Sequence, residues 1–510
     1  MVAGLVSLTA CTTLGPDYQQ PTLDWVDDWQ PDLYNALQSD IAIDGDELRF
    51  WEHLLHDPVL AKLLDIVRRD SISLHIAGLR VIESRAQLAI AGKLVYPQAQ
   101  TINGSVAYTD SRAASGGSEG SVSATGYQAG ASVGWEIDFW GRFQRSIETA
   151  DANFFGSVAN QQNVQVLLVA QVADLYYQYR TLQQRIDIAN QNADLQQRSF
   201  EITGRKFENG ESSELDLQQA KSQYMATLSA IPDLELSLIN VRNSLSLVLS
   251  RPPGKIVEIT GELDELPYVK PEEIAEIPAQ LLIRRPDVRL AAYQIAAQTS
   301  QIGIAEAAKY PSISLFGTIG WSGDDGSSSQ TIQTISAGPS LSWTVFNYGR
   351  FTNNVRVQDT RLQQLIETYH QSVLQAAIEV DNAVSAIVKT HEQQQYTNQS
   401  LEAARRSLTL ATSRYREGYA DFQRVLDAQR SLFSQSERDL INRGKHVSGL
   451  ISLYKALGGG WVDMSIEEYI PESMRKLMKA RTDWGELLIA PIPVESSWLA
   501  ETQAEEQISE

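Results

Sequence analysis

The sequence WEIDFWGRF at residues 135–143 returns in altered form as WTVFNYGRF at residues 343–351. Each copy begins with Trp, alternates apolar with polar residues, and ends in Gly-Arg-Phe. Alternation with a period of two indicates a β-strand with one apolar face. Helical periodicity follows each Gly-Arg, so each copy marks a point where a strand gives way to a helix.

The two stretches belong to a longer internal repeat. RAQLAIAGKLVYPQ at 85–98 matches TSQIGIAEAAKYPS at 299–312, and RKFENG at 205–210 matches SRYREG at 413–418. From Gly-Arg onward the two halves stay in register without a gap. The unit spans roughly 180 residues, well beyond the 20 to 50 residues of solenoid repeats, so the chain is interpreted as a duplicated half-molecule.

Each half is predicted to contain two strands. The clearer strand alternates from Tyr127 to Phe139 in the first half and from Ile335 to Val345 in the second. The strand before it includes Ile102 in the first half and Ile313 in the second. Strands of about ten residues with one apolar face, joined by polar Gly/Ser-rich loops, are typical of a transmembrane β-barrel.

Aromatic residues gather near the Gly-Arg end of the predicted strands. Indole rings prefer the interface between lipid and water. We therefore expect an aromatic girdle facing lipid, made of Trp135, Trp140, Trp321 and Trp343. A soluble β-sandwich is the alternative, but only four strands are evident and long helices follow them.

Long helices are predicted after Arg142 and Arg350. Apolar residues step by four and three alternately from Leu168 to Ala193, which is the heptad seam of helices packed side by side. The matching seam of the second half begins at Ala376 and turns polar from Thr390. Gly210 and Gly418 are expected to end these helices, and helices return through 215–249 and 423–457.

Closure of the sheet requires more than one chain. Four strands cannot close a barrel, and a bilayer tolerates no open sheet edge. Two copies would supply eight strands and three would supply twelve; a wide lumen needs more than eight. The paired helices would continue such a barrel as a long hollow cylinder.

Composition excludes several classes of protein. The 510 residues carry a net charge of −21, which argues against nucleic-acid binding. No run approaches the roughly 18 to 20 apolar residues of a membrane-spanning helix. The sequence lacks a nucleophile-elbow, P-loop or dinucleotide motif, so we expect no enzyme and no cofactor.

Two further motifs have structural explanations. His53 and His56 form an H-x-x-H without a nearby third ligand, whereas catalytic zinc usually has three, so we expect no metal site. In Arg284-Arg285-Pro286-Asp287, Pro286 suits the first helical position and Asp287 suits the positive end of a helix dipole.

Cys11 is the only cysteine, so an intrachain disulfide is impossible. It ends the sequence Leu8-Thr9-Ala10-Cys11, which resembles a bacterial lipobox, in which the cysteine is lipidated. The preceding segment is short and lacks a basic residue, as a start assigned too late would explain. The alternative is a frayed N-terminus with an unmodified cysteine.

Several motifs together resemble the TolC-like outer membrane efflux protein family, specifically its lipoprotein (NodT-type) branch among the outer membrane factors of RND efflux systems. They cover nearly the whole chain: LTAC (8–11), LGPDYQQP (14–21), FWEHLLHDPVLAKLL (50–64), LLIRRPDVRLAAYQIA (281–296) and VLDAQRSLFSQ (425–435). The chain departs from the family in its short signal and in its long acidic tail after Trp461.

The resemblance implies an α+β membrane protein. It would be a homotrimer with a twelve-stranded β-barrel, four strands per chain, in the outer membrane of a Gram-negative bacterium, continued by a periplasmic coiled-coil barrel. It would dock with a periplasmic adaptor and an inner membrane RND-type pump and export drugs or other small molecules. A duct for type I protein secretion and a purely structural envelope lipoprotein remain alternatives.

The expected organisation has six parts. They are a signal (1–10), a lipid-anchored segment (11–69), a first repeat (70–254), an equatorial linker (255–283), a second repeat (284–461) and an acidic tail (462–510).

The resemblance also implies a periplasmic gate. Positions matching Asp216 and Tyr415 link neighbouring coils in the family, and Asp427 matches an acidic residue that rings the constriction. Arg424 and Arg430 lie three residues either side of Asp427, so a local ion pair on a solvated helix is the alternative explanation.

Overall fold

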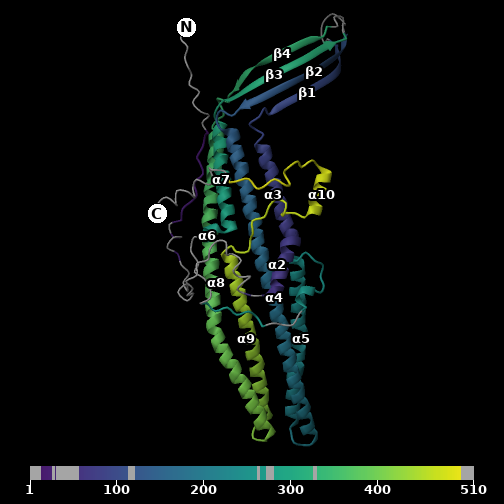
Figure 1. Ribbon diagram of the computed structural model, residues 1–510, viewed down its shortest axis with the longest axis vertical. Coiled ribbons are helices and arrows are strands. Elements are labelled where there is room, and N and C mark those ends of the chain that lie inside the picture. The colour runs from purple at the N-terminus through teal and green to yellow at the C-terminus, as the bar shows by residue number, and fades with distance from the viewer. Residues whose placement is uncertain are drawn as a thin grey trace.

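The protein is an elongated molecule with a β-sheet at one end and helical hairpins at the other (Figure 1). The computed structural model describes residues 13–23, 25, 29, 55, 57–112, 121–260, 265–271, 281–325 and 330–495. Among the helices of these segments, none has the length and apolar character needed to cross a membrane.

The two halves have the same order of elements. Each consists of a short helix, a β-hairpin, a helix of 67 residues and a helix of 35 residues. The first half comprises α3 (Ile72–Ala91), β1 (Ala99–Arg112), β2 (Ser121–Ile137), α4 (Arg142–Glu208) and α5 (Glu214–Val248). The second comprises α7 (Pro286–Ala307), β3 (Ser312–Asp324), β4 (Ile332–Ser342), α8 (Arg350–Arg416) and α9 (Phe422–Ala456).

Short elements pack beside the long helices. They are α2 (Pro58–Asp70), the 3₁₀ helix η3 (Val257–Ile259), α6 (Leu281–Arg284) and α10 (Glu472–Arg481). Pro286 begins α7 as predicted, and the backbone N–H of Val288 donates to the Asp287 carboxylate at 3.0 Å.

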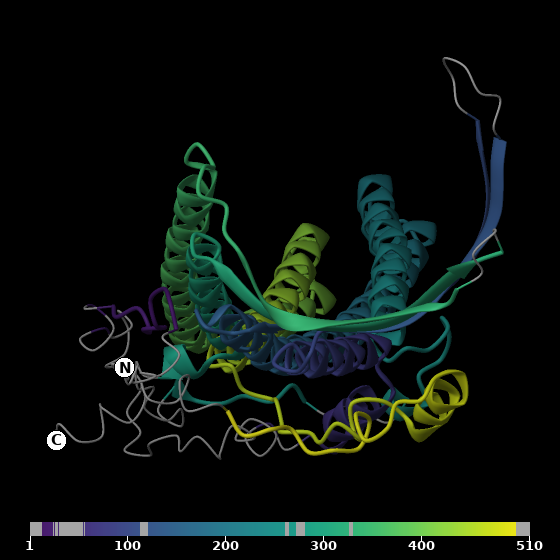
Figure 2. The same ribbon diagram turned by 90° about the horizontal axis from the view of Figure 1, so that it is seen from above.

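The four strands form one antiparallel sheet in the order β1-β2-β3-β4. From above, it is a curved strip over an arc of helices (Figure 2). Trp135 lies opposite Leu315, which lies opposite Pro339. Within the segments that the structure describes, β1 and β4 each have one strand partner, so the sheet has two open edges.

The register confirms the predicted apolar face. Side chains directly opposite each other in an antiparallel pair point to the same side of the sheet. One face therefore carries Ile102, Val106, Tyr108, Tyr127, Val133, Trp135, Leu315, Ile319, Trp321, Ile335 and Leu341. The other is mostly Gly, Ser and Thr, with Phe316 and Ile332 as large apolar exceptions.

Two details of the strand prediction are wrong. The alternation in the second half extends to Val345, but β4 ends at Ser342 because β3 begins opposite it at Ser312 and leaves later residues without a partner. Trp321 does not lie near the Gly-Arg end. It is nine residues beyond Ser312 in β3, which at about 3.3 Å per residue places it roughly 30 Å along the strand.

Glycines mark the predicted ends of the long helices. Gly141 and Gly349 precede α4 and α8 with φ of 72° and 81°, and Gly210 and Gly418 follow them with φ of 77° and 80°. This left-handed conformation is strained for residues with a Cβ atom. The handover from strand to helix after each Gly-Arg-Phe copy is therefore confirmed, as are the helix ends.

The buried stripe of α4 follows the predicted seam only in part: Leu168, Val172, Ala189 and Ala193 of the seam are buried. Val169, Val172, Ala173 and Tyr176 are almost fully buried, whereas Leu175, Tyr179, Leu182 and Ile186 in the predicted seam are only half-buried. The reason is that α2, α8 and α9 share one core with this part of α4, so α4 is not packed against a single helix partner.

The second-half seam does turn polar where predicted, and its polar residues are buried. Thr390 Oγ1 lies 2.9 Å from His446 Nδ1, and Thr397 donates to the Asp439 carboxylate at 3.3 Å. Buried polar groups of this kind require hydrogen-bond partners, and α9 supplies them to α8.

The segment after Trp461 packs against the short helix of the first repeat (Figure 1). Tyr469 is buried with Val81 and Ile82 of α3. A Cβ atom on Gly78 would lie 2.6 Å from the Tyr469 Cβ. The described part of the tail is thus an integral part of the upper core.

Candidate functional site

The two helical hairpins end at the pole opposite the sheet (Figure 1). In the α4–α5 turn, Ser213 caps α5: its hydroxyl accepts from the Asp216 N–H at 3.1 Å. The Asp216 carboxylate accepts from the Ser213 N–H at 3.3 Å and from the Ser212 hydroxyl at 3.1 Å. This reciprocal capping box holds the turn and positions Asp216.

Tyr415, on the last turn of α8, lies against the α4–α5 hairpin of the same chain. Lys206 Nζ is 4.5 Å from its ring centroid, a cation–π distance. Burial raises the pKa of the Tyr415 phenol, and the nearby Asp216 charge adds to this, while side-chain hydrogen bonds with Thr203 and Ser212 oppose it. The structure places Tyr415 close enough to Asp216, within one chain, for the carboxylate charge to act on the phenol.

A small apolar cluster supports this arrangement. Phe422, Val425 and Leu426 of α9 are buried with Ala220 of α5, and Tyr415 packs against them. The Tyr415 and Phe422 rings are 5.3 Å apart. The two hairpin tips are thus joined by apolar contacts as well as by polar ones.

Asp427 lies on the exposed side of α9. Its carboxylate accepts from Gln423 at 3.0 Å and is 3.6 Å from Arg430 Nη1. Arg430 also donates to Gln223 of α5 at 2.6 Å. Arg424 is exposed and forms no salt bridge with any described residue, so only one of the two predicted arginines offsets the Asp427 charge.

The strand–helix junction holds three of the four predicted girdle residues. The indole N–H groups of Trp135, Trp140 and Trp343 donate to the carbonyls of Val95 (3.1 Å), Pro311 (2.7 Å) and Lys309 (3.1 Å). Each tryptophan is thereby tied to a turn between a short helix and a strand, whereas Trp321 lies near the far end of the sheet.

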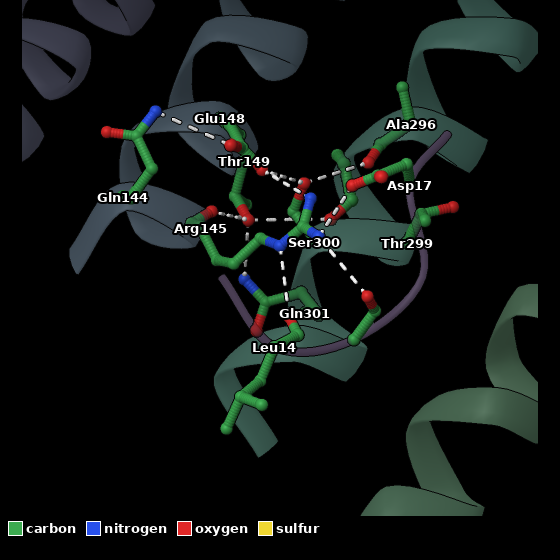
Figure 3. Close-up of polar contacts among 12 residues, drawn as sticks. Leu14, Asp17, Gln144, Arg145, Glu148, Thr149, Ala296, Thr299, Ser300 and Gln301 are labelled. Carbon is green, nitrogen blue, oxygen red and sulfur yellow. Dashed lines mark hydrogen bonds and ion pairs between the residues drawn. The ribbon is translucent and has the colours of Figure 1, made fainter. Parts of the chain in front are cut away.

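A buried ion pair in α4 also holds the N-terminal segment (Figure 3). Arg145, whose side chain is 5% exposed, is 2.9 Å from Glu148 and 2.7 Å from Asp17. It also donates to the carbonyls of Leu14 (3.1 Å) and Gly15 (3.3 Å). Burial opposes its charge, but the hydrogen bonds and charges of Asp17 and Glu148 hold the Arg145 pKa above its ordinary value.

The residues that follow Cys11 therefore have a defined place. The Leu14 N–H donates to the Trp140 carbonyl at 3.3 Å, and a Cβ atom on Gly141 would lie 2.7 Å from the Thr13 side chain. Residues 13–20, which we call the strap, begin at the strand–helix junction and reach Tyr369 of α8, where Gln20 donates at 3.5 Å.

Two polar contacts were not among the sequence predictions: the Arg145 cluster and the contact of Tyr268 with two histidines. Arg145 and Glu148, three residues apart on a helix that otherwise becomes apolar, were an available signal. Tyr268 of the inter-repeat linker hydrogen-bonds His391 at 2.7 Å and stacks on His446 at 4.7 Å. No periodic pattern indicates this contact.

Cys11, His53 and His56 lie outside the described residues. Among those that the structure describes, no group of three or more His, Cys, Asp or Glu side chains could hold a metal ion.

Comparison with known proteins settles the family. The sequence profile described as "Outer membrane efflux protein" matches residues 63–251 and again residues 277–459, one match per repeat. The chain belongs to the outer membrane efflux protein family. The resemblance shown by the sequence motifs is thereby confirmed.

Relatives of this efflux protein match along most of their length. The cation efflux system protein CusC of Escherichia coli O6:H1 is 30% identical, with 89% of this chain and 97% of CusC covered. The probable outer membrane lipoprotein SilC of Salmonella typhimurium is 28% identical, with 91% and 98% covered. The outer-membrane channel OprN superposes with a TM-score of 0.76 at 29% identity, covering 88% of this chain and 99% of OprN.

The predicted function and fold class are confirmed at this level. The protein is an outer membrane efflux channel, and each chain contributes four strands continued by long helices. Members of the family are channel proteins rather than enzymes.

Proposed function

We propose that three copies of this chain close a twelve-stranded barrel in the outer membrane, continued as a hollow cylinder into the periplasm. The observation that carries the proposal is the four-stranded sheet, which has one apolar face and two open edges. Unpaired edges are not tolerated in a bilayer. Twelve strands enclose a lumen, which eight strands barely allow.

The assembled channel would receive small molecules from an inner membrane RND-type pump through a periplasmic adaptor. Relatives of similar identity are named for cation efflux, for pyoverdine export and for toluene efflux. Such different cargoes on one scaffold support a general duct, with selection made by the pump.

Native mass spectrometry and planar-bilayer recording test the assembly together. A trimer that conducts ions is expected. A stable monomer or dimer would contradict the stoichiometry. A trimer without conductance under any applied voltage would favour the structural lipoprotein.

The gate is proposed at the hairpin tips, with Tyr415, Asp216 and Asp427 as its central residues. The Lys206–Tyr415 contact, the packing of Ala220 against Phe422, and the hydrogen bond from Arg430 to Gln223 hold the α8–α9 tip against the α4–α5 tip. Such contacts can each be worth about 1 kcal/mol, which a docked adaptor and pump can overcome. Three Asp427 side chains around one axis would favour cations at the entrance.

Single-channel recording tests the gate. The double variant Asp216→Ala/Tyr415→Phe should conduct more than the wild type, because it removes the carboxylate and the hydroxyl between the hairpins. The matched control is Tyr419→Phe, which changes an exposed tyrosine of the same tip. Conductance equal to that of the wild type would remove Asp216 and Tyr415 from the gate. Asp427→Ala should reduce cation selectivity, and unchanged selectivity would exclude Asp427.

Lipidation is proposed at Cys11. In support, Thr13 lies against Gly141 at the strand–helix junction, so an acyl chain two residues earlier would start close to the sheet. Metabolic labelling with a fatty acid should mark the wild type and not Cys11→Ser; label that persists in the variant would exclude the site.

The four tryptophans are proposed to contact lipid at two levels. Trp135, Trp140 and Trp343 belong to the helix-proximal level and Trp321 to the distal level. In vesicles with brominated lipids, depth-dependent quenching of single-tryptophan variants should separate Trp321 from the others. Quenching at one common depth would contradict this division.

A further inference from the structure

The two Gly-Arg-Phe junctions differ in their contacts within the chain: the first is packed against other residues, and the second is largely exposed. In the first, Trp140 donates to the Pro311 carbonyl at 2.7 Å and stacks on Tyr310 with centroids 4.7 Å apart. Arg142 pairs with Glu136 at 3.0 Å. The first junction is therefore packed against the turn between α7 and β3.

The second junction has almost no such contacts. Phe346 is 86% exposed and Tyr348 is 100% exposed. Tyr348 also has a φ of 51°, a conformation that a bulky residue rarely adopts. Arg350 forms no salt bridge among the described residues, because Thr344 occupies the position that Glu136 has in the first copy. Large exposed aromatic side chains that lie close together indicate an interaction surface.

The internal repeat identifies the aromatic partner that Tyr348 lacks within the chain. The two Gly-Arg-Phe sequences align Tyr348 with Trp140, and the two Tyr-Pro sequences align Tyr96-Pro97 with Tyr310-Pro311. Within the chain Trp140 finds Tyr310, but the equivalent partner of Tyr348 lies at the opposite edge of the same chain, in the turn before β1. Tyr96 is itself 59% exposed.

We propose that the second junction is completed by a second copy of this chain: Tyr348 packs on Tyr96 of the next copy, as Trp140 packs on Tyr310. In the same interface, residues 343–345 extend β4 and pair with β1 of the next copy. The inference rests on the proposed homotrimer and specifies its seam residue by residue.

The strand register of the seam follows from the repeat. Ala131 lies opposite Ile102, and its counterpart Pro339 lies opposite Leu315, so Ile102 and Leu315 are equivalent. Trp135 lies opposite Leu315. Trp343, the counterpart of Trp135, is therefore opposite Ile102 of the next copy.

The same reasoning gives a second strand pair. Val133 lies opposite Gly317. Their counterparts are Leu341 and Gly104, which form the next pair on the apolar face of the seam.

This register agrees with the two-residue side-chain period. It places Trp343 and Ile102 on one apolar face that continues around the assembly, whereas a shift of one residue would turn one of them to the polar face. It also explains why the alternation in the sequence extends to Val345 although β4 of the single chain ends at Ser342. The missing strand partner belongs to another copy.

The long helices show the same difference between the repeats. Leu374 and Ile378 of α8 are 49% and 53% exposed, whereas their counterparts in α4, Val166 and Ala170, are 3% and 5% exposed. The face of α8 thus carries apolar side chains at positions that are covered in α4. A second copy would cover both the junction and this part of α8.

Disulfide trapping tests the register, in a Cys11→Ser background that removes the native thiol. Leu341→Cys/Gly104→Cys should give disulfide-linked dimers and trimers on non-reducing gels, because opposed strand residues bring Cβ atoms within reach of a disulfide. The matched control Val133→Cys/Gly317→Cys should close within one chain and migrate as a monomer. A Cβ atom has room at both glycine positions.

The shifted pair Leu341→Cys/Ile102→Cys should link much less. If it links as well as the Gly104 pair, or if a trimer confirmed by native mass spectrometry shows no link at all, the proposed register is wrong and the channel proposal stands. A protein that remains monomeric in native mass spectrometry would overturn both.

The aromatic contact is tested separately by the temperature at which the trimer dissociates on gels. Tyr348→Ala should lower that temperature, and Tyr348→Trp, which copies the first junction, should retain it. Tyr419→Ala, which truncates another exposed tyrosine, should leave it unchanged. Equal effects of Tyr348→Ala and Tyr419→Ala would overturn the assignment of Tyr348 to the seam.

Discussion

Gly15 and Gly303 meet backbone to backbone: a Cβ atom on Gly15 would lie 2.5 Å from the Gly303 Cα. A Cβ atom on Gly303 would in turn lie 2.5 Å from the Leu14 carbonyl oxygen. The strap therefore crosses α7 at the one level where neither chain segment has a side chain. Gly15 also has a φ of 91°, which suits glycine.

Gly303→Ala should displace the strap. The added methyl group cannot be accommodated without moving backbone, and overpacking of this kind costs about 1 to 3 kcal/mol. Limited proteolysis should cut the variant within residues 13–20 faster than the wild type. Gly204→Ala is the control, because its Cβ would meet only the Leu217 side chain at 3.8 Å and alanine favours a helix. Equal cleavage of Gly303→Ala and the wild type would contradict the close crossing.

Arg145→Met should destabilise the upper helices markedly. It leaves Glu148, whose side chain is 10% exposed, without its cation, and removing one partner of a buried pair costs roughly 3 to 5 kcal/mol. Denaturant titration would measure the loss. Arg142→Met, which breaks a pair with 42% and 27% exposed side chains, should cost less than about 1 kcal/mol.

The double variant Arg145→Met/Glu148→Gln separates charge from packing. It removes the unpaired carboxylate, so it should regain part of the stability lost by Arg145→Met. If it is no more stable than Arg145→Met, the loss comes from the contacts with the strap and not from the buried charge of Glu148.

The two faces of the sheet should respond differently to charge. Ile319 and Thr318 are neighbours in β3 and point to opposite faces. If the apolar face contacts lipid, Ile319→Arg should destabilise the assembled protein by about 2 to 4 kcal/mol near the bilayer midplane. Thr318→Arg should cost less. Unfolding in lipid vesicles would measure both, and equal costs would contradict the assignment of the faces.

His446 should make stability depend on pH. Burial lowers its pKa below the ordinary value of 6.5, although hydrogen bonding to the Val269 carbonyl at 2.7 Å opposes the shift. Below pH 6.5 the unfolded chain takes up a proton before the folded one does. The free energy of unfolding therefore falls as the pH drops from 6.5 through the lower folded pKa.

Thermal unfolding at pH 7.5 and pH 5 would measure this dependence. His446→Gln should reduce the difference between the two temperatures, whereas His370→Gln, which changes a more exposed histidine, should not. A difference unchanged in His446→Gln would assign the pH dependence to other groups.

Much of the architecture was predictable because it is periodic. The alternation before Gly141 and Gly349 predicts strands, the change of period predicts helices, and the glycines with positive φ mark where helices begin and end. The two halves can be aligned from their repeated motifs alone, before any of their contacts is known. Such features depend on neighbours within a few residues, so local sequence carries them.

The gate region was only partly predictable. Sequence motifs pointed to Tyr415 and Asp216, but not to Lys206, whose ammonium lies over the Tyr415 ring. Lys206 and Tyr415 lie on different helices, each in the last turn of its helix. Whether the two side chains meet depends on the length and curvature of both hairpins, and no single residue in the sequence determines these.

By itself, the sequence determined the duplicated order of strands and helices, the apolar face of the sheet, and the motifs of the efflux family. Only the tertiary structure decided that Arg145 reaches Asp17 across 128 positions, that the strap crosses α7 at Gly303, and that one Gly-Arg-Phe junction is packed while the other is open. The physical reason is that period and composition act along the chain, whereas burial and ion pairing depend on which distant segments the packed helices bring together.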